Sequence, residues 1–156
     1  MSYSRIELMR NDIKTALEII TIENGYRTTP RQIVSQFLNP LNVSQYPTLA
    51  VVIGDSAITS FSSQRSALSE DVTMHILLYV KSDASTDAGF SEASEALIQD
   101  VKRVIQTRMI ANVNDSSNKY ITSGPISTMR LPDMKNGVGV HRISFKVKVL
   151  YDPGTF

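Results

Sequence analysis

The side chains that most often do chemistry are sparse in this sequence. It has two histidines, His75 and His141, and no cysteine among 156 residues. Both histidines fall in segments that read as strands, and neither belongs to an H-x-x-H or H-E pattern that would indicate a metal site. We expect each to be hydrogen-bonded at a sheet face. Without cysteine there are no disulfides, thiolate ligands or cysteine nucleophile, which fits a reducing cytoplasm.

Familiar catalytic and nucleotide-binding motifs are absent from the sequence. There is no GxGxxG, P-loop or GxSxG, and Gly124, Gly137 and Gly139 fall in predicted loops. The acids are dispersed, and the Glu70-Asp71 pair fits the polar start of a strand better than a general acid and base. We therefore predict a protein that is not an enzyme, with no catalytic residues, no cofactor and no bound metal.

A short basic stripe is the remaining candidate for binding chemistry. Lys146 and Lys148 share one face of the last predicted strand, with Arg142 nearby. Proteins that bind single-stranded nucleic acid stack bases on aromatic side chains, and none is interleaved on this face. The formal net charge is only +1, so no overall field recruits nucleic acid or an anionic membrane. The stripe therefore fits a solvated strand face or a salt-bridging surface between subunits.

Two amphipathic helices must position these residues. Around residues 6–20, the apolar side chains recur at three- and four-residue steps, and Gly25 offers a residue to end the helix. The first stripe is Ile6, Met9, Ile13, Leu17 and Ile20. The second stripe is Phe90, Ala93, Leu97, Val101, Val104, Ile105 and Arg108, and Glu92, Glu95, Asp100, Lys102 and Arg103 fall outside it.

Strands are predicted between and after the helices. Pro30, Pro40 and Pro47 exclude a helix from the first connection, where residues 33–38 read as a short strand or one helical turn. Residues 48–53 read as an apolar strand covered on both faces, or on one face and by a neighbouring subunit. Residues 72–80 read as a strand with Val72, Met74, Ile76, Leu78 and Val80 on one face and Thr73, His75, Leu77 and Tyr79 on the other. Residues 56–69 between them are polar, which predicts a hairpin whose projecting tip is a mobile loop or a docking arm.

The last third of the chain reads as strands again. Residues 120–131 hold one or two strands interrupted at Gly124-Pro125, and residues 132–139 form a loop with a turn at Asn136-Gly137. Val138–Tyr151 is expected to be the longest strand. Its first two valines are out of phase with the apolar set that begins at Ile143, which predicts a bulge near His141-Arg142.

The whole pattern predicts one α+β domain over residues 1–156, with a mainly antiparallel or mixed sheet packed against two main helices. The first residues are charged and lack the apolar core of a signal peptide. The longest apolar runs have strand length, so we expect a soluble protein with no membrane partner.

The short sequence motifs and the order of these elements resemble those of the tail terminator, or tail completion, proteins of long-tailed bacteriophages. The likeness is strongest at the phrase G-Y-x-T, which begins at Gly25, and at P-x-L-x-V-x-x-G, over residues 47–54. It continues through the strand V-x-M-x-I-x-L-x-V at residues 72–80 and the helix with an acidic start that follows.

This resemblance implies a virion structural protein of the tail and neck, assembled in the host cytoplasm. It implies a homo-oligomeric ring, expected to be a hexamer, that caps the tail tube and stops its polymerisation. The implied partners are the tail tube protein, the neck or connector protein and, in contractile tails, the sheath protein, with DNA only as passing cargo. No catalytic residues come with the family.

A ring needs two different interfaces on each subunit. The residues that we predict to contribute to contacts between subunits, or with the tube or neck, are Arg27, Arg31, Phe61, Arg65, Arg142, Lys146 and Lys148. The alternatives are another head–tail joining or neck subunit, or a tail tube subunit. From other classes, a small-molecule-binding or nucleic-acid-binding α+β domain remains open.

Overall fold

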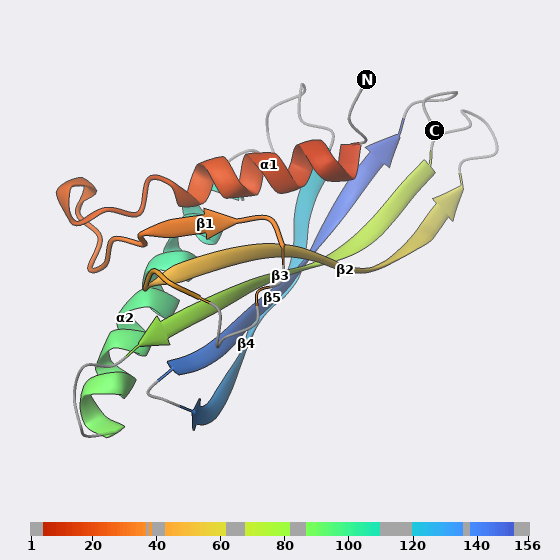
Figure 1. Ribbon diagram of the computed structural model, residues 1–156. Helices are drawn as coiled ribbons and strands as arrows, with labels where there is room; N and C mark the ends of the chain where they lie inside the picture. The colour runs from red at the N-terminus through yellow and green to blue at the C-terminus, as the bar shows by residue number, and fades with distance from the viewer. Residues whose placement is uncertain are drawn as a thin grey trace.

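The computed structural model describes residues 5–36, 38, 43–61, 68–81, 87–109, 120–135 and 138–151 (Figure 1). Two helices of three turns or more and five strands lie in these ranges, which confirms the predicted α+β class. In chain order the elements are α1 (Arg5–Leu17), a 3-10 turn η1 (Ile22–Asn24), β1 (Gln32–Val34), β2 (Thr48–Phe61), β3 (Leu68–Lys81), α2 (Asp87–Val104), a π-helical turn η3 (Ile105–Met109), β4 (Tyr120–Lys135) and β5 (Val138–Tyr151).

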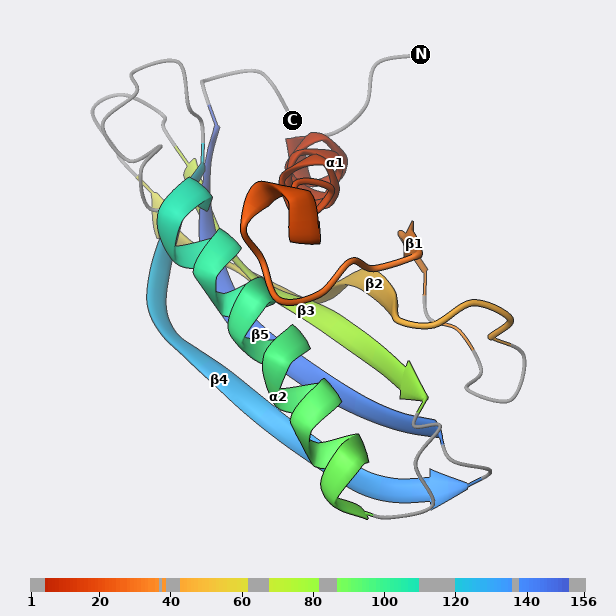
Figure 2. The ribbon, with the colours of Figure 1, turned by 90° about the vertical axis from the view of Figure 1, so that its left-hand side faces the viewer.

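The strands form one mixed sheet in the order β1-β2-β3-β5-β4. The short β1 runs parallel to β2, and the other neighbours are antiparallel. Both helices lie on one side of this sheet, and Figure 2 views the sheet from that side.

The main core lies between the sheet and the two helices. The alternate residues of β3 that begin at Val72 are fully buried there, as predicted for one of its faces. Four residues of the predicted first helical stripe, Met9, Ile13, Leu17 and Ile20, are at most 1% exposed, and the middle of α2 packs beside them. Apolar stripes of both helices are thus buried against one apolar sheet face, which is the usual source of stability in this architecture.

A smaller apolar cluster covers part of the opposite sheet face. Ala50, Leu77 and Tyr79 project to this side and pack with Val43 of the segment before β2. The Tyr79 hydroxyl donates a hydrogen bond to the Leu38 carbonyl at 2.8 Å and accepts one from the Leu38 N–H at 3.1 Å. This anchors the connection between β1 and β2 over one end of the sheet.

The predicted bulge near His141-Arg142 is wrong. The β3–β5 register is continuous from Leu68 paired with Tyr151 to Lys81 paired with Val138. The two valines at the start of β5 are out of phase because that end of the strand faces the smaller cluster, which Val140 contacts. A change of the buried face therefore explains the pattern without an inserted residue.

Irregularities occur instead in β2 and β4. The register of β4 against β5 shifts between Ser123 and Ser127 and again between Leu131 and Lys135. Because β4 continues through Gly124-Pro125, it has 16 residues against 14 in β5, so β5 is not the longest strand as predicted. Prolines and bulges are tolerated here because β4 is an edge strand.

Several boundaries also differ from the prediction. The hairpin after residue 56 is confirmed, but its strands extend to Phe61 and resume at Leu68. The expected loop at 132–139 is mostly strand, and its turn at residues 136–137 lies outside the described residues. Gly25, at φ 87°, ends the 3-10 turn η1, whereas α1 already ends at Leu17.

Candidate interaction surfaces

A buried carboxylate on α2 holds the loop that follows η1. Asp100 is only 3% exposed, although the sequence placed it outside the apolar stripe. Its oxygens accept hydrogen bonds from the Arg27 N–H at 3.1 and 3.2 Å and from the Thr28 N–H at 2.8 Å. The Thr28 hydroxyl donates a further bond at 2.5 Å. A buried carboxylate needs such donors, and here they come from 72 or 73 residues earlier in the chain.

Arg103 extends this contact by one helical turn. Its guanidinium lies 4.6 Å from the centre of the Tyr26 ring, a cation–π geometry, and donates a hydrogen bond to the Gly25 carbonyl at 3.3 Å. The Arg27 side chain turns to the same helix and donates to the Gln99 side-chain oxygen at 2.9 Å. All four residues of the G-Y-x-T phrase therefore contact α2.

The turn before this phrase is also held by its own hydrogen bonds. The Thr21 hydroxyl accepts the Asn24 N–H at 3.1 Å and caps η1, and the Thr29 hydroxyl accepts the Ile22 N–H at 2.9 Å. Ile22 itself is 66% exposed. This hydrogen-bonded turn therefore exposes one large apolar side chain, that of Ile22, to solvent.

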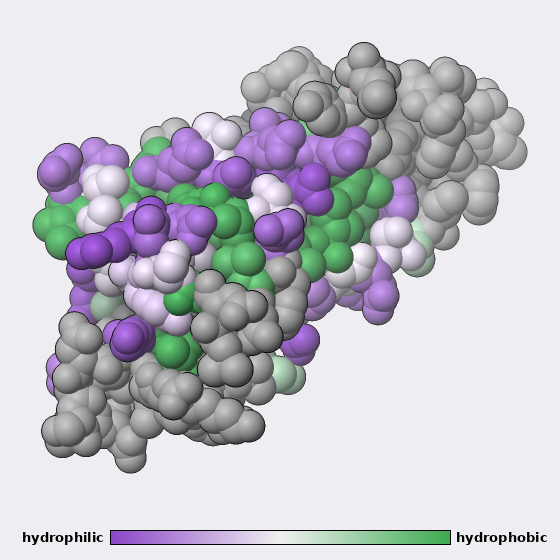
Figure 3. Space-filling model, in the orientation of Figure 1, coloured by the Kyte–Doolittle hydropathy of each residue, from purple (hydrophilic) through white to green (hydrophobic). Residues whose placement is uncertain are grey.

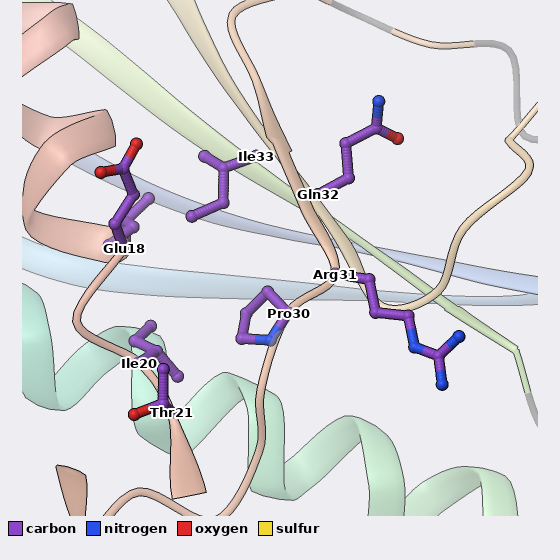
Figure 4. Close-up of a pocket in the computed structure, with 8 residues that line it drawn as sticks. Glu18, Ile20, Thr21, Pro30, Arg31, Gln32 and Ile33 are labelled. Carbon is purple, nitrogen blue, oxygen red and sulfur yellow. The ribbon is translucent and has the colours of Figure 1, made fainter. Parts of the chain in front are cut away.

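A shallow pocket of about 220 Å³ lies beside this loop, between the end of α1 and β1. Its lining residues are Leu17, Glu18, Ile20, Thr21, Pro30, Arg31, Gln32 and Ile33. Ile33 and Pro30 point toward the α1 side, whereas Arg31 and Gln32 point away from it (Figure 4). Apolar surface is visible between α1 and β1, bordered by hydrophilic side chains (Figure 3). Aliphatic and polar side chains contribute equally to the lining of the pocket.

The sheet face opposite the helices carries the basic residues of β5. Lys146 is exposed, and Arg142 and Lys148 are partly buried. Lys148 lies opposite Asp71 in the register of β3, and Arg142 lies between Leu77 and Met129. The predicted stripe therefore exists as a row along β5, on the open face of the sheet.

His75 lies in the middle of this open face. Its Nδ1 is 2.7 Å from the Ser144 hydroxyl, and its ring occupies the space above Gly54, where an added Cβ would lie 2.6 Å from Nε2. Burial lowers the pKa of His75, the positive charge of Arg142 lowers it further, and Asp55 opposes both. The neutral imidazole therefore packs here between β2 and β5.

His141 lies on the helix side and is 4% exposed. Its Nε2 is 3.0 Å from the hydroxyl of Ser94 on α2. Both histidines are thus hydrogen-bonded at a sheet face, as predicted. In the part of the chain that the structure describes, no three histidines and acids group as metal ligands would, and no helix is long and apolar enough to cross a membrane.

The predicted interface residues fall into separate groups. Arg142, Lys146 and Lys148 share the open sheet face, whereas Arg27 lies against α2 and Arg31 precedes β1. Phe61 pairs with Leu68 at the end of β2, but its side chain is outside the described residues, and so is Arg65.

Sequence reasoning missed Asp100, Arg103 and Ser94. Each contact joins α2 to a segment at least 47 residues away, so no local spacing indicates it. The only available signal was a carboxylate in the middle of a helix, away from the acidic first turn. Comparison of the sequence with models of known protein families and with characterised proteins finds no match.

Proposed function

We propose that this chain is a structural subunit of a phage tail, a terminator that forms a ring, caps the tail tube and joins it to the neck. The resemblance of the G-Y-x-T and P-x-L-x-V-x-x-G phrases supports this. The resemblance implies a sheet packed against two helices, and the described fold agrees with that expectation.

The observation that carries the proposal is the organisation of the G-Y-x-T loop. Its residues are fastened to α2 through Asp100 and Arg103, and the loop stays at the surface with Ile22 exposed. A loop that is already ordered loses little conformational entropy on binding. Such a loop suits repeated docking to a tube or a neighbouring subunit.

The molecule also offers the two different surfaces that a cyclic ring requires. One is the helix side, formed by α2 and the clamped loop that it holds. The other is the basic open face of the sheet. A subunit that joins neighbours head to tail uses one surface for each neighbour.

A tube-capping assay tests this function. Purified protein is added to tube subunits of the same phage during polymerisation, and tube lengths are measured by negative-stain electron microscopy. We expect rings at one tube end and shorter, uniform tubes, whereas tubes of unchanged length without end rings contradict the proposal. Tubes formed by this protein alone would assign it as a tube subunit instead. Salt-dependent retention on DNA, or a thermal shift with metabolites or nucleotides, would favour the remaining alternatives.

A further inference from the structure

The two layers of the fold expose surfaces of different charge on opposite sides. The helices cover one sheet face (Figures 1 and 2). The register places the row of cations of β5 on the other face. On the outer side of α2, Glu92 is exposed and Glu95 partly exposed, ahead of the exposed Arg103. The first half of α2 is therefore acidic on its outer side.

The cations of the open face outnumber its carboxylates among the described residues. Lys148 lies opposite Asp71 in the register, and the charges of Arg142 and Asp55 both act on His75. The Arg142 guanidinium donates a hydrogen bond to the Met129 sulfur at 3.5 Å, and its Nε is buried without a hydrogen bond. The three cations of the row therefore keep a small positive excess over Asp55 and Asp71.

We propose that the acidic first half of α2 of one copy docks on the basic open face of the next copy. This inference rests on the proposed ring, whose head-to-tail interface it identifies. The interface is heterologous, because a helix side meets a sheet side, and repetition of such a contact closes a ring when the rotation allows it.

The spacing of the charges fits a two-point contact. Lys146 and Lys148 lie two residues apart on one strand face, about 7 Å. Glu92 and Glu95 lie three residues apart on one helix side, about 5–6 Å between Cβ atoms. The two pairs therefore have similar spacings, and docking also covers the second face of the sheet.

Charge reversal with complementation tests the contact. The basic-face variant carries Lys146→Glu and Lys148→Glu, and the acidic-helix variant carries Glu92→Lys and Glu95→Lys. We expect each alone to associate about 100-fold more weakly than wild type, because like charges then face each other. Native mass spectrometry of a 1:1 mixture should restore rings with equal numbers of both variants, since each reversed surface matches the other.

Controls separate this contact from folding and from the ring itself. Asn11→Lys and Thr15→Glu place new charges at exposed positions of α1, away from both surfaces, and should leave assembly unchanged. If a double variant loses its cooperative melting transition, the single changes Lys146→Glu and Glu92→Lys, both at exposed positions, replace it.

If the wild type forms rings and the charge-reversed variants form them equally well, the proposed interface is overturned. The terminator function is not contradicted by that result. Variants that dissociate but fail to reassemble on mixing would show that these two surfaces do not meet, which also overturns the inference. A wild type that stays monomeric at every concentration contradicts both the inference and ring formation.

Discussion

Replacement of Asp100 by alanine tests whether the carboxylate holds the G-Y-x-T loop. The change removes the acceptor of the Arg27 N–H, the Thr28 N–H and the Thr28 hydroxyl. The side chain is buried on α2, so its removal also leaves a small void beside the loop. The loop then loses its main attachment to the helix.

The expected loss follows from these three donors. A hydrogen bond to a charged group contributes about 1.5–3 kcal/mol. The loop side of the contact is only partly buried, so water replaces some of this, and we expect a loss of about 3 kcal/mol in the free energy of unfolding. For a chain of this size that corresponds to a melting temperature lowered by about 6–12 °C.

Urea denaturation and amide hydrogen exchange measure the effect. The Arg27 and Thr28 amides should exchange much faster in Asp100→Ala than in wild type, while exchange of the central amides of β3 should accelerate only in proportion to the loss of global stability. Asp100→Asn should fall between the two proteins, because its NH2 group faces a donor. Gln99→Ala, which removes only the exposed bond to Arg27, should cost less than about 0.5 kcal/mol. An Asp100→Ala protein as stable as Gln99→Ala would refute the reasoning.

Three further changes test other contacts. Gly54→Ala should cost about 1–3 kcal/mol in urea denaturation, because its Cβ meets the His75 ring at 2.6 Å; full stability would show that the ring moves freely. Burial, and then Arg142, lowers the folded-state pKa of His75 below 6.5, so the unfolded chain binds its proton first. The contribution of His75 to the free energy of unfolding is therefore complete above pH 6.5 and is lost as the pH drops through the folded-state pKa. His75→Gln should flatten that part of the plot of unfolding free energy against pH. Tyr79→Phe should cost about 1–2 kcal/mol, because the Leu38 N–H and carbonyl lose their partner; a loss below 0.3 kcal/mol would contradict this.

Strong periodicity made the main elements predictable. The alternation along residues 72–80 identified β3 and the apolar face that begins at Val72, because each strand side chain points to one face or the other. The stripe from Ile6 to Ile20 identified α1 for the corresponding reason in a helix.

Other features depend on contacts between distant segments. The valines at the start of β5 suggested a bulge, because nothing local shows that the β1–β2 connection covers that end of the sheet. The burial of Asp100 was equally hidden, since its partners lie in another loop. The basic row on β5 was predictable from the sequence. The acidic side of α2 became a candidate partner for that row only when the structure placed the helices and the row on opposite sides of the sheet.

Native mass measurement of the purified wild-type protein tests the central claim most directly. Over micromolar to tens of micromolar concentrations, in volatile buffer of low ionic strength, the account predicts one discrete closed oligomer, expected to be a hexamer of the 17.3 kDa chain. A monomer across that range, or an open-ended series of masses, would contradict the account of this chain as a ring-forming terminator.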